Sequence, residues 1–214
     1  MKFFQKALLT ALAVCILTLP LSSMALAGQT EASSPVADQS EAYVPGQVPA
    51  QTGVVDTMTP ALHGVILAML NHDVSTLNVN DTDLMWESLY NMLSLYGQLD
   101  ERSQMEGDVL TFPSETVRDY AAALVSNYPV LGSLPPALAD RLTYDSREDC
   151  YQVACGSDDL AQLQVRDVET SAEGIRLEGA LVYLVDGTDL VRFEATLEPR
   201  DTMFGYAITQ FVLK

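Results

Sequence analysis

The sequence after its N-terminal region carries hydrophobic residues at helical spacing. Downstream of Thr59, apolar side chains recur every three or four residues, which predicts an amphipathic helix from Thr59 to about Asn71. Thr59 would be the N-cap and Pro60 the first helical residue. The apolar stripe consists of Leu62, Val65, Ile66, Met69 and Leu70.

A second helix is predicted from Asp81–Asp83 to about Gln98. Its polar residues form one narrow stripe, made of Glu87, Asn91, Ser94 and Gln98. A helix that is apolar around most of its circumference is buried on more than one side. We therefore expect this segment to be the long central helix of the domain.

Two further helices precede a change in the hydrophobic period. One is predicted to begin at Ser114, as N-cap, and to end before Pro129, and a short one is predicted over 136–142. From about Thr143 onward the period is two, which is typical of strands. The predicted strands are Cys150–Ala154, Leu160–Val168, Ile175–Val185, Leu190–Leu197 and Phe204–Leu213.

Short turns join the last strands, for example at Asp186-Gly187, so we expect an antiparallel meander. Helices followed by strands indicate the α+β class. The predicted architecture is a set of N-terminal helices packed on one curved antiparallel sheet of four to five strands.

The N-terminal 27 residues have the pattern of a secretory signal peptide. Two lysines precede an apolar stretch over 7–19, Pro20 interrupts it, and Ala25 and Ala27 supply small residues for cleavage before Gly28. A membrane anchor is the alternative, but the apolar core is short for one. A lipoprotein site is disfavoured because Cys15 lies inside the apolar core. We expect a secreted or periplasmic protein.

Residues 28–56 carry three Pro, three Gly and three Ser, no Leu, Ile, Phe or Trp, and only acidic charges. A segment of this composition buries too little apolar surface to offset its ordering entropy. It is predicted to be a disordered linker, and residues 57–214 are predicted to form a single domain.

The charge of the chain excludes two classes of partner. The 214 residues contain 11 Lys and Arg against 29 Asp and Glu, a net charge of −18. Loss of residues 1–27 removes two lysines and makes the charge −20. Such a field repels nucleic-acid phosphates and anionic lipid headgroups. After removal of the signal peptide we expect no membrane insertion, because no later apolar run reaches the ~20 residues that a spanning helix needs.

Cys150 and Cys155 are the two cysteines outside the signal peptide. In an oxidising compartment such a pair is often bridged. A straight strand over residues 150–155 would hold the two Cα atoms roughly 16 Å apart, whereas bridged Cα atoms lie within about 7 Å. A bridge therefore needs a bend over 151–154, and two unbridged thiols, or a bridge between chains, are the alternatives.

Catalytic, metal and cofactor motifs are not found in the sequence. His63 and His72 are nine residues apart and lack a metal-ligand spacing, so both are expected to be structural or at the surface. The oxygen-rich segment 78–83 lacks the Gly and Glu of a calcium loop and is interpreted as a helix cap. Asp158-Asp159 is interpreted as a solvated turn. We expect no cofactor and no metal.

Aromatic residues are candidates for a ligand pocket, and the alternative is that those on the central helix belong simply to the core. Those on the predicted central helix would face those on the sheet across a cavity. The candidates are Trp86, Tyr90, Tyr96, Tyr183, Phe193 and Tyr206.

The order of helices, a Tyr144-Asp145 to Tyr151 hairpin and three long strands resembles the cystatin-like and nuclear-transport-factor-2-like cone. It is similar in particular to exported bacterial domains of that shape with no assigned activity. The resemblance implies a curved sheet that wraps a long helix. Cystatins use a Gln-x-Val-x-Gly loop, but Ala154 replaces the Val here, so inhibition is not implied.

Three functions are compatible with this pattern. The first is an exported, non-catalytic binding or interaction module that takes a small apolar ligand or a protein partner. The second is a small acid–base enzyme acting on an apolar substrate, which would need a buried Asp, Tyr or His in the cavity. The third is an accessory protein that docks a basic partner through its acidic surface. The missing motifs favour the first.

Overall fold

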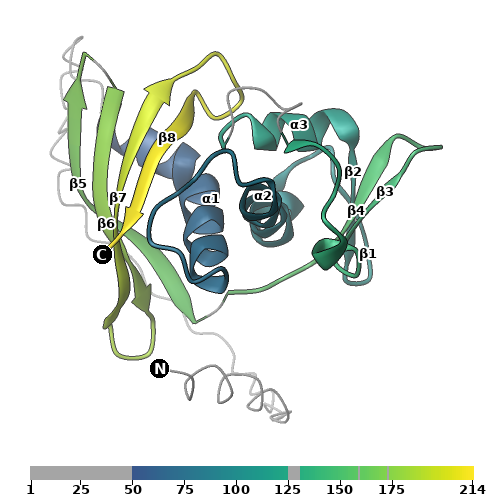
Figure 1. Ribbon diagram of the computed structural model, residues 1–214, viewed down its shortest axis with the longest axis horizontal. Coiled ribbons are helices and arrows are strands. Elements are labelled where there is room, and N and C mark those ends of the chain that lie inside the picture. Colours follow the sequence, from purple (N-terminus) through teal and green to yellow (C-terminus); the bar gives the residue numbers. More distant parts are fainter. Residues whose placement is uncertain (1–49, 125–130, 159, 173) are drawn as a thin grey trace, which may run out of the picture. The chain divides into compact units, whose positions relative to one another are not determined.

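The computed structural model describes residues 50–124, 131–158, 160–172 and 174–214 (Figure 1). The predicted signal peptide and residues 28–49 of the predicted linker lie outside these ranges. The described residues belong to one compact unit. Its described part is α+β, with three α-helices and two antiparallel sheets of four strands each.

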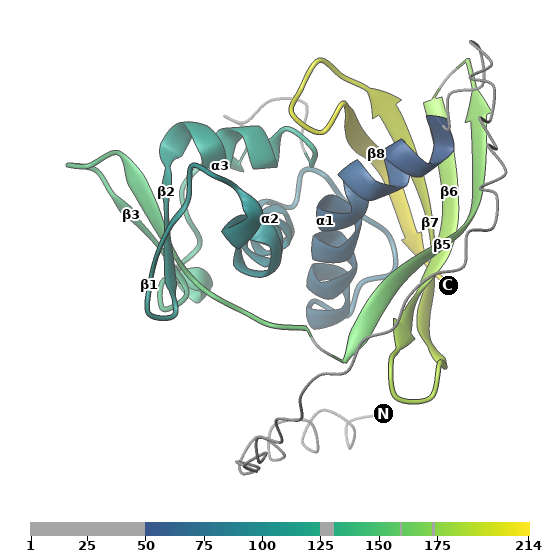
Figure 2. The ribbon, with the colours of Figure 1, turned by 180° about the vertical axis from the view of Figure 1, so that it is seen from behind.

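The first helix, α1 (Ala50–Asn71), begins nine residues before the predicted N-cap. The predicted start at Thr59 is therefore wrong, and residues 50–56 are helical instead of part of a linker. The physical reason is burial: Val54 and Met58 extend the apolar stripe by one turn each and lie in the core. Pro60 lies inside the helix, and α1 bends partway along its length in Figure 2, as a proline without an N–H donor produces.

The second helix, α2 (Thr82–Tyr96), matches its prediction. The side chain of Asp81 caps it by accepting a hydrogen bond of 3.1 Å from the Leu84 N–H, which confirms the cap interpretation of segment 78–83. A short 3₁₀ helix, η1 (Gly97–Leu99), continues it. Most of α2 is buried, including the polar residues Ser88, Asn91 and Ser94. Asn91 and Ser94 belong to the predicted polar stripe, but each donates a hydrogen bond to a backbone carbonyl.

The first sheet contains four short strands, β1 (Gln104–Glu106), β2 (Val109–Pro113), β3 (Leu142–Asp145) and β4 (Cys150–Ala154), in the order β1-β2-β4-β3.

The third helix, α3 (Ser114–Ala121), follows β2, with Pro113 instead of Ser114 as its N-cap residue. A short 3₁₀ helix, η3 (Pro136–Leu138), lies in the predicted helical segment 136–142.

The prediction of a single sheet is wrong because residues 104–113, where no strand was predicted, form a hairpin. Gly107 turns this hairpin with a φ of 60°. The hairpin supplies β2 as a partner for β4, whose residues Cys150 to Ala154 pair with Pro113 to Val109. The predicted strand 150–154 is confirmed, but it lies outside the sheet that the later strands form.

The second sheet has the order β5-β6-β7-β8, with each strand antiparallel to the next. Its inner residues pack in the core, as Phe193, Ala195 and Leu197 do on β7. The predicted alternation on that strand is confirmed, because Glu194 and Thr196 between them are partly exposed. The strands are β5 (Ala161–Ser171), β6 (Gly174–Tyr183), β7 (Asp189–Pro199) and β8 (Tyr206–Leu213).

Helix α1 lies between the β5–β8 sheet and α2, and α2 in turn lies next to the β1–β4 sheet (Figures 1 and 2). The β5–β8 sheet is the larger sheet because its strands are longer. The helix that packs on it is therefore α1, whereas the sequence indicated residues 81–98. The segment Gly53–Asn71 is long and apolar enough to cross a membrane by length and composition alone. Burial against α2 and the sheet explains the apolar character of this helix, since core helices share that composition.

Candidate functional site

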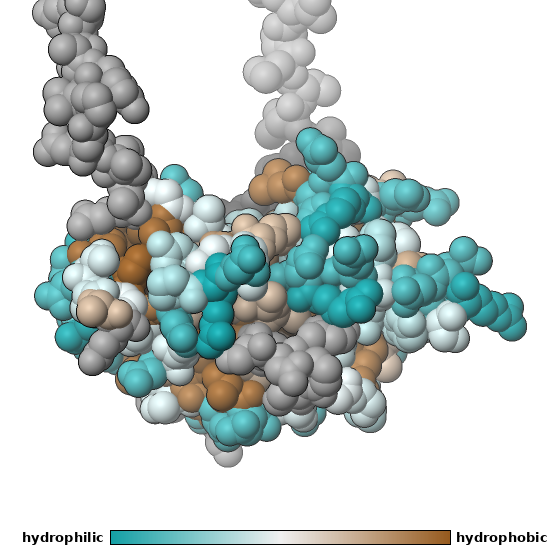
Figure 3. Space-filling view, turned by 90° about the horizontal axis from the view of Figure 1, so that it is seen from above, coloured by the Kyte–Doolittle hydropathy of each residue, from teal (hydrophilic) through white to brown (hydrophobic). Residues whose placement is uncertain are grey.

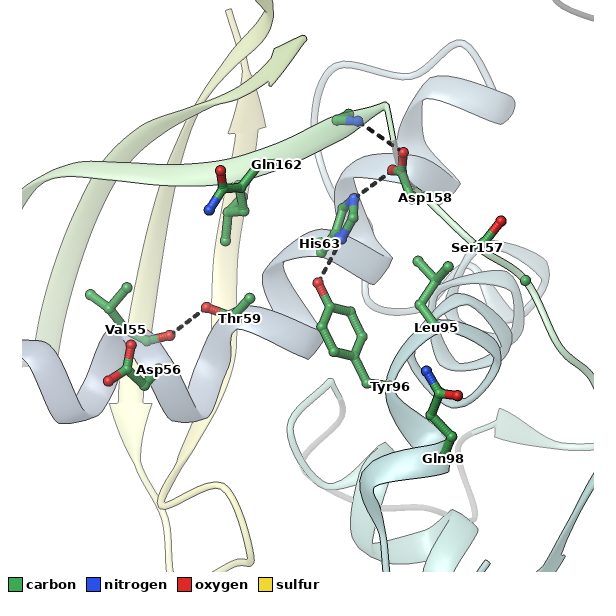
Figure 4. Close-up of a pocket in the computed structure, with 13 residues that line it drawn as sticks. Val55, Asp56, Thr59, His63, Leu95, Tyr96, Gln98, Ser157, Asp158 and Gln162 are labelled. Atoms are coloured by element: carbon green, nitrogen blue, oxygen red, sulfur yellow. Dashed lines mark hydrogen bonds and ion pairs between the residues drawn. The ribbon is translucent and has the colours of Figure 1, made fainter. Parts of the chain in front are cut away.

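A pocket of about 480 Å³ opens between α1, the end of α2 and the beginning of β5 (Figure 4). Three chain segments and the link between the two sheets converge on it. Eight of the thirteen described residues that line it are polar, so it differs from the apolar pocket expected from the sequence. The lining residues are Val55, Asp56, Thr59, His63, Leu95, Tyr96, Gln98, Gly156, Ser157, Asp158, Ala161, Gln162 and Leu163.

Helix α1 contributes Asp56, Thr59 and His63 to the pocket. These residues are spaced by three and four positions, so they lie on one face of the helix (Figure 4). The Thr59 hydroxyl donates a hydrogen bond of 2.8 Å to the carbonyl oxygen of Val55, one turn earlier. Its hydrogen is thus used within the helix, and the oxygen keeps its lone pairs for the pocket.

His63 connects the two other walls of the pocket. Its Nδ1 lies 2.7 Å from the hydroxyl of Tyr96, at the end of α2, and its Nε2 lies 3.0 Å from Oδ2 of Asp158. The imidazole is almost fully buried, and its ring meets that of Tyr96 edge-on with centroids 5.9 Å apart. A buried polar ring of this kind is stable because both of its nitrogens have partners.

Asp158 is an ionised acceptor in this arrangement. Burial by itself would raise the pKa of Asp158, but the hydrogen bond from His63 and the backbone N–H groups of Leu160 and Ala161 hold that pKa below its ordinary value. An ionised carboxylate has no hydrogen to donate, so Nε2 of His63 carries a hydrogen. In the neutral imidazole Nδ1 then accepts the hydroxyl hydrogen of Tyr96.

Tyr96 remains protonated over the physiological range. Burial, and secondarily the negative charge of Asp158, raise the pKa of the Tyr96 phenol to about 12. A phenol with this pKa is a poor nucleophile at neutral pH. Its hydrogen is directed to His63, so its oxygen presents lone pairs to the pocket.

The predicted aromatic candidates are not brought together. Tyr96 lines the pocket, but Trp86 and Tyr90 point away from it, toward the β1–β4 sheet. The indole of Trp86 is buried, packs against Tyr151 and donates a hydrogen bond of 2.9 Å to the Leu131 carbonyl. The hydroxyl of Tyr90 lies 3.4 Å from the Ala154 carbonyl.

The three candidates on the larger sheet also lie outside this pocket. Phe193 is buried and stacks on Phe211 of the neighbouring strand, with centroids 5.2 Å apart. Tyr183 ends β6 and Tyr206 begins β8, and both are partly exposed. The expected wall of facing aromatics does not form because α1 occupies the space between α2 and this sheet (Figure 1).

Cys150 and Cys155 are both free thiols in the structure. Cys150 begins β4, which runs in regular register with β2 and β3 as far as Ala154. The bend that an intrachain bridge requires is absent from this strand, so the structure agrees with the unbridged alternative. Burial and nearby carboxylates raise the pKa of both thiols.

His72 has the surface role that the sequence predicts. Its Nε2 lies 2.9 Å from Oε2 of Glu87, near the C-terminal end of α1. His63 is buried, and its contacts with Tyr96 and Asp158 were not expected from the sequence. Within the described ranges no group of three or more His, Cys, Asp or Glu side chains could hold a metal ion.

The site residues missed from the sequence are Asp158, interpreted as a solvated turn, and the α1 face formed by Asp56, Thr59 and His63. The helical spacing of those three residues is a signal for one polar face. It was hidden because the helix was predicted to begin only at Thr59. No local signal pairs His63 with Asp158, which lies 95 residues away.

A smaller cavity of about 280 Å³ lies at the C-terminal end of α1, against Val191 of β7 and Leu213 of β8. On the face drawn in Figure 3, hydrophilic residues predominate and the hydrophobic residues form several separate patches. Scattered patches of this kind are ordinary for a globular surface and identify no partner.

Comparison of the chain with protein-family models, with the curated proteins and with the solved structures found no match. The fold and the pocket are thus the basis for any functional assignment.

Proposed function

We propose that the protein is exported and that its folded part is a non-catalytic binding domain, which holds a small polar molecule in the pocket between α1, α2 and β5. The pocket of about 480 Å³ is the observation that carries this proposal. Its volume is in the range of small-molecule sites, and its polar groups converge from several elements, as such sites require.

The hydrogen bonds of His63 support a binding role. Both nitrogens are engaged, one by Tyr96 and one by Asp158. The contacts of His63 fix the side chains of Tyr96 and Asp158, which gives a rigid, pre-organised wall. Pre-organisation of this kind improves affinity because less side-chain freedom is lost on binding.

The proposal retains the resemblance to the cystatin-like and nuclear-transport-factor-2-like cone, with α1 as the long helix that a curved meander sheet covers. The position of α1 against β5–β8 supports this assignment (Figure 2). The pocket at one end of α1 corresponds to the opening between helix and sheet that the resemblance implies. The ligand differs from the apolar molecule expected from the sequence because the lining residues are mostly polar.

A fragment screen followed by NMR tests the proposed function. The probes are a library of charged and neutral polar fragments, added to a ¹⁵N-labelled chain that begins at Gly28. Binding fragments should shift the amide signals of Thr59, Tyr96 and Gln162, around the pocket, and leave those of β1–β4 unchanged. A screen in which no fragment shifts the pocket signals contradicts the proposal.

An acid–base enzyme is the second candidate, and one observation favours it. A carboxylate that orients a histidine, which in turn contacts a hydroxyl, is the arrangement found in proton-transfer sites. In such an enzyme the Tyr96 hydroxyl would contact the substrate, and His63 and Asp158 would position it. Fragments that bind are incubated in D₂O and followed for exchange of a C–H proton. Exchange in the wild type that is lost in Tyr96→Phe would establish catalysis, and binding without exchange supports the non-catalytic function.

A further inference from the structure

We infer that the pocket selects a ligand with a cationic hydrogen-bond donor, such as a primary ammonium group. This inference rests on the proposed binding function and names the class of molecule bound. The argument comes from the donor and acceptor atoms that the wall presents, and from its charge.

Three donors of the wall, on Thr59, Tyr96 and His63, are used within the protein, whereas Gln98, Ser157 and Gln162 line the pocket with groups that can both donate and accept. The Thr59 hydroxyl hydrogen is directed to the Val55 carbonyl and the Tyr96 hydroxyl hydrogen to His63. The Nε2–H of His63 is directed to Asp158. What remains available to a ligand at these positions is the lone pairs of the two hydroxyl oxygens, which accept hydrogen bonds but donate none.

The charge of the pocket wall also favours a cationic ligand. Asp56 and Asp158 are two of the thirteen lining residues, and no Lys or Arg is among them. Asp158 already accepts hydrogen bonds from His63 and from the Ala161 N–H. Asp56 has no hydrogen bond or ion pair among the described residues, so its carboxylate is available to a ligand. A carboxylate ligand would meet two like charges without a compensating cation, whereas an ammonium group gains from both.

Three molecules with four-carbon chains test the inference: 1,4-diaminobutane, 1,4-butanediol and succinate. Each is titrated into the chain beginning at Gly28, by calorimetry and by NMR, at two salt concentrations. We expect the diamine alone to bind with shifts at the pocket amides. Attraction to the net charge of −20 on that chain would also draw the diamine to other surfaces, so binding must persist at the higher salt concentration.

Two variants and a matched control locate the binding. Asp56→Asn and Thr59→Val each remove a group that contacts the ammonium, so each should weaken diamine binding by about tenfold or more. The control is Asp201→Asn, an equal charge change at an exposed residue outside the pocket, which should leave the affinity within about twofold.

The remaining outcomes separate this inference from the proposed function. Binding of succinate or the diol at the pocket, without the diamine, would leave the binding function intact and overturn the cationic specificity. Equal weakening by Asp201→Asn would show diffuse attraction to the acidic surface and also overturn it. If none of the three binds, the inference is wrong, and the fragment screen alone decides whether the pocket binds small molecules.

Discussion

His63 and Asp158 are 95 residues apart in the sequence, and their Nε2 and Oδ2 atoms lie 3.0 Å apart. The contact joins the middle of α1 to the segment that links the two sheets. Asp158 also accepts a hydrogen bond of 3.1 Å from the Ala161 N–H at the beginning of β5. One carboxylate therefore connects α1 with the start of the larger sheet.

Removal of the Asp158 carboxylate should destabilise the protein. In Asp158→Ala the buried Nε2–H of His63 loses its acceptor, which costs about 1–3 kcal/mol of unfolding free energy. Urea denaturation of the two proteins at pH 7 measures the difference. The control is Asp201→Ala, at an exposed residue with no hydrogen bond or ion pair among the described residues, where the change should stay within about 0.5 kcal/mol.

The lowered pKa of Asp158 predicts how the stability of the protein changes at acid pH. Because its pKa is lower in the folded protein, Asp158 binds a proton more weakly there than in the unfolded chain. Its contribution is fully present above the ordinary pKa of about 3.9 and is lost as the pH falls through the folded value. The stability difference between wild type and Asp158→Ala should therefore shrink below pH 4. A difference that is constant from pH 7 to pH 3 would contradict this account of the contact.

The pKa of Tyr96 makes a prediction at the opposite end of the pH scale. Tyr96 and Tyr120 both have pKa values raised to about 12, in each case by burial first and by a nearby aspartate second. In the unfolded chain they ionise near pH 10, so folding keeps their protons on and stability falls between pH 10 and 12. Phenolate absorbance should show these tyrosines titrating later than exposed ones.

Two variants assign the late-titrating groups. Tyr96→Phe and Tyr120→Phe should each remove one tyrosine from the late part of the titration and leave the early part unchanged. Tyr183→Phe is the control, because Tyr183 is a partly exposed residue at the end of β6, outside the pocket. Loss of an early-titrating group in Tyr96→Phe would place Tyr96 in water and remove the basis for its contact with His63.

Local patterns predicted the parts of the fold whose stability is local. The extent of α2 follows from the Asp81 cap and an apolar run, and the β5–β8 strands follow from alternation and short turns. The beginning of α1 was predicted wrongly because Thr59-Pro60 has the composition of a helix start. Burial of Val54 and Met58 against the core outweighs that local signal.

The site could be predicted only in fragments. Asp56, Thr59 and His63 share a face once α1 is known to begin at Ala50, and that face is visible in the sequence. The contact between His63 and Asp158 depends on how α1 meets the link between the two sheets, which no local pattern encodes. The hairpin over 104–113 forms a second sheet with β3 and β4. Trp86 and Tyr90 contact residues of β4 in that sheet, so the expected aromatic pocket does not form.

The close packing of α1 on α2 depends on Gly64. A Cβ atom at this position would lie 2.7 Å from the Ser88 carbonyl oxygen and 2.8 Å from Cγ of Met92. Gly64→Ala should therefore push the helices apart and destabilise the protein by about 1–3 kcal/mol, despite the higher helix propensity of Ala. Thermal and urea unfolding measure the change.

Gly53 is the matched control for Gly64, since it lies in the same helix. A Cβ atom there meets nothing within 4 Å, so Gly53→Ala should be neutral or stabilising by up to about 1 kcal/mol. Equal effects of the two substitutions would mean that α1 and α2 do not approach each other closely at Gly64.

The last prediction concerns Cys150 and Cys155, which are free thiols in the structure. Export, as proposed above, would expose them to oxidising conditions. Because β4 is a regular strand from Cys150 to Ala154, closing a bridge would disrupt its pairing with β2 and β3. Unfolding the non-reduced chain that begins at Gly28 in the presence of iodoacetamide should therefore label two cysteines, as measured by mass spectrometry. In the folded protein at pH 8, labelling should be slower than for an exposed thiol, since burial and neighbouring carboxylates raise both pKa values and lower the thiolate fraction.

Cys150→Ser and Cys155→Ser provide the control for the unfolding experiment, because each variant should carry one label. If the wild type carries none and each variant carries one, the cysteines form a bridge within the chain and β4 bends. A disulfide-linked dimer of the wild type would place the bridge between chains instead.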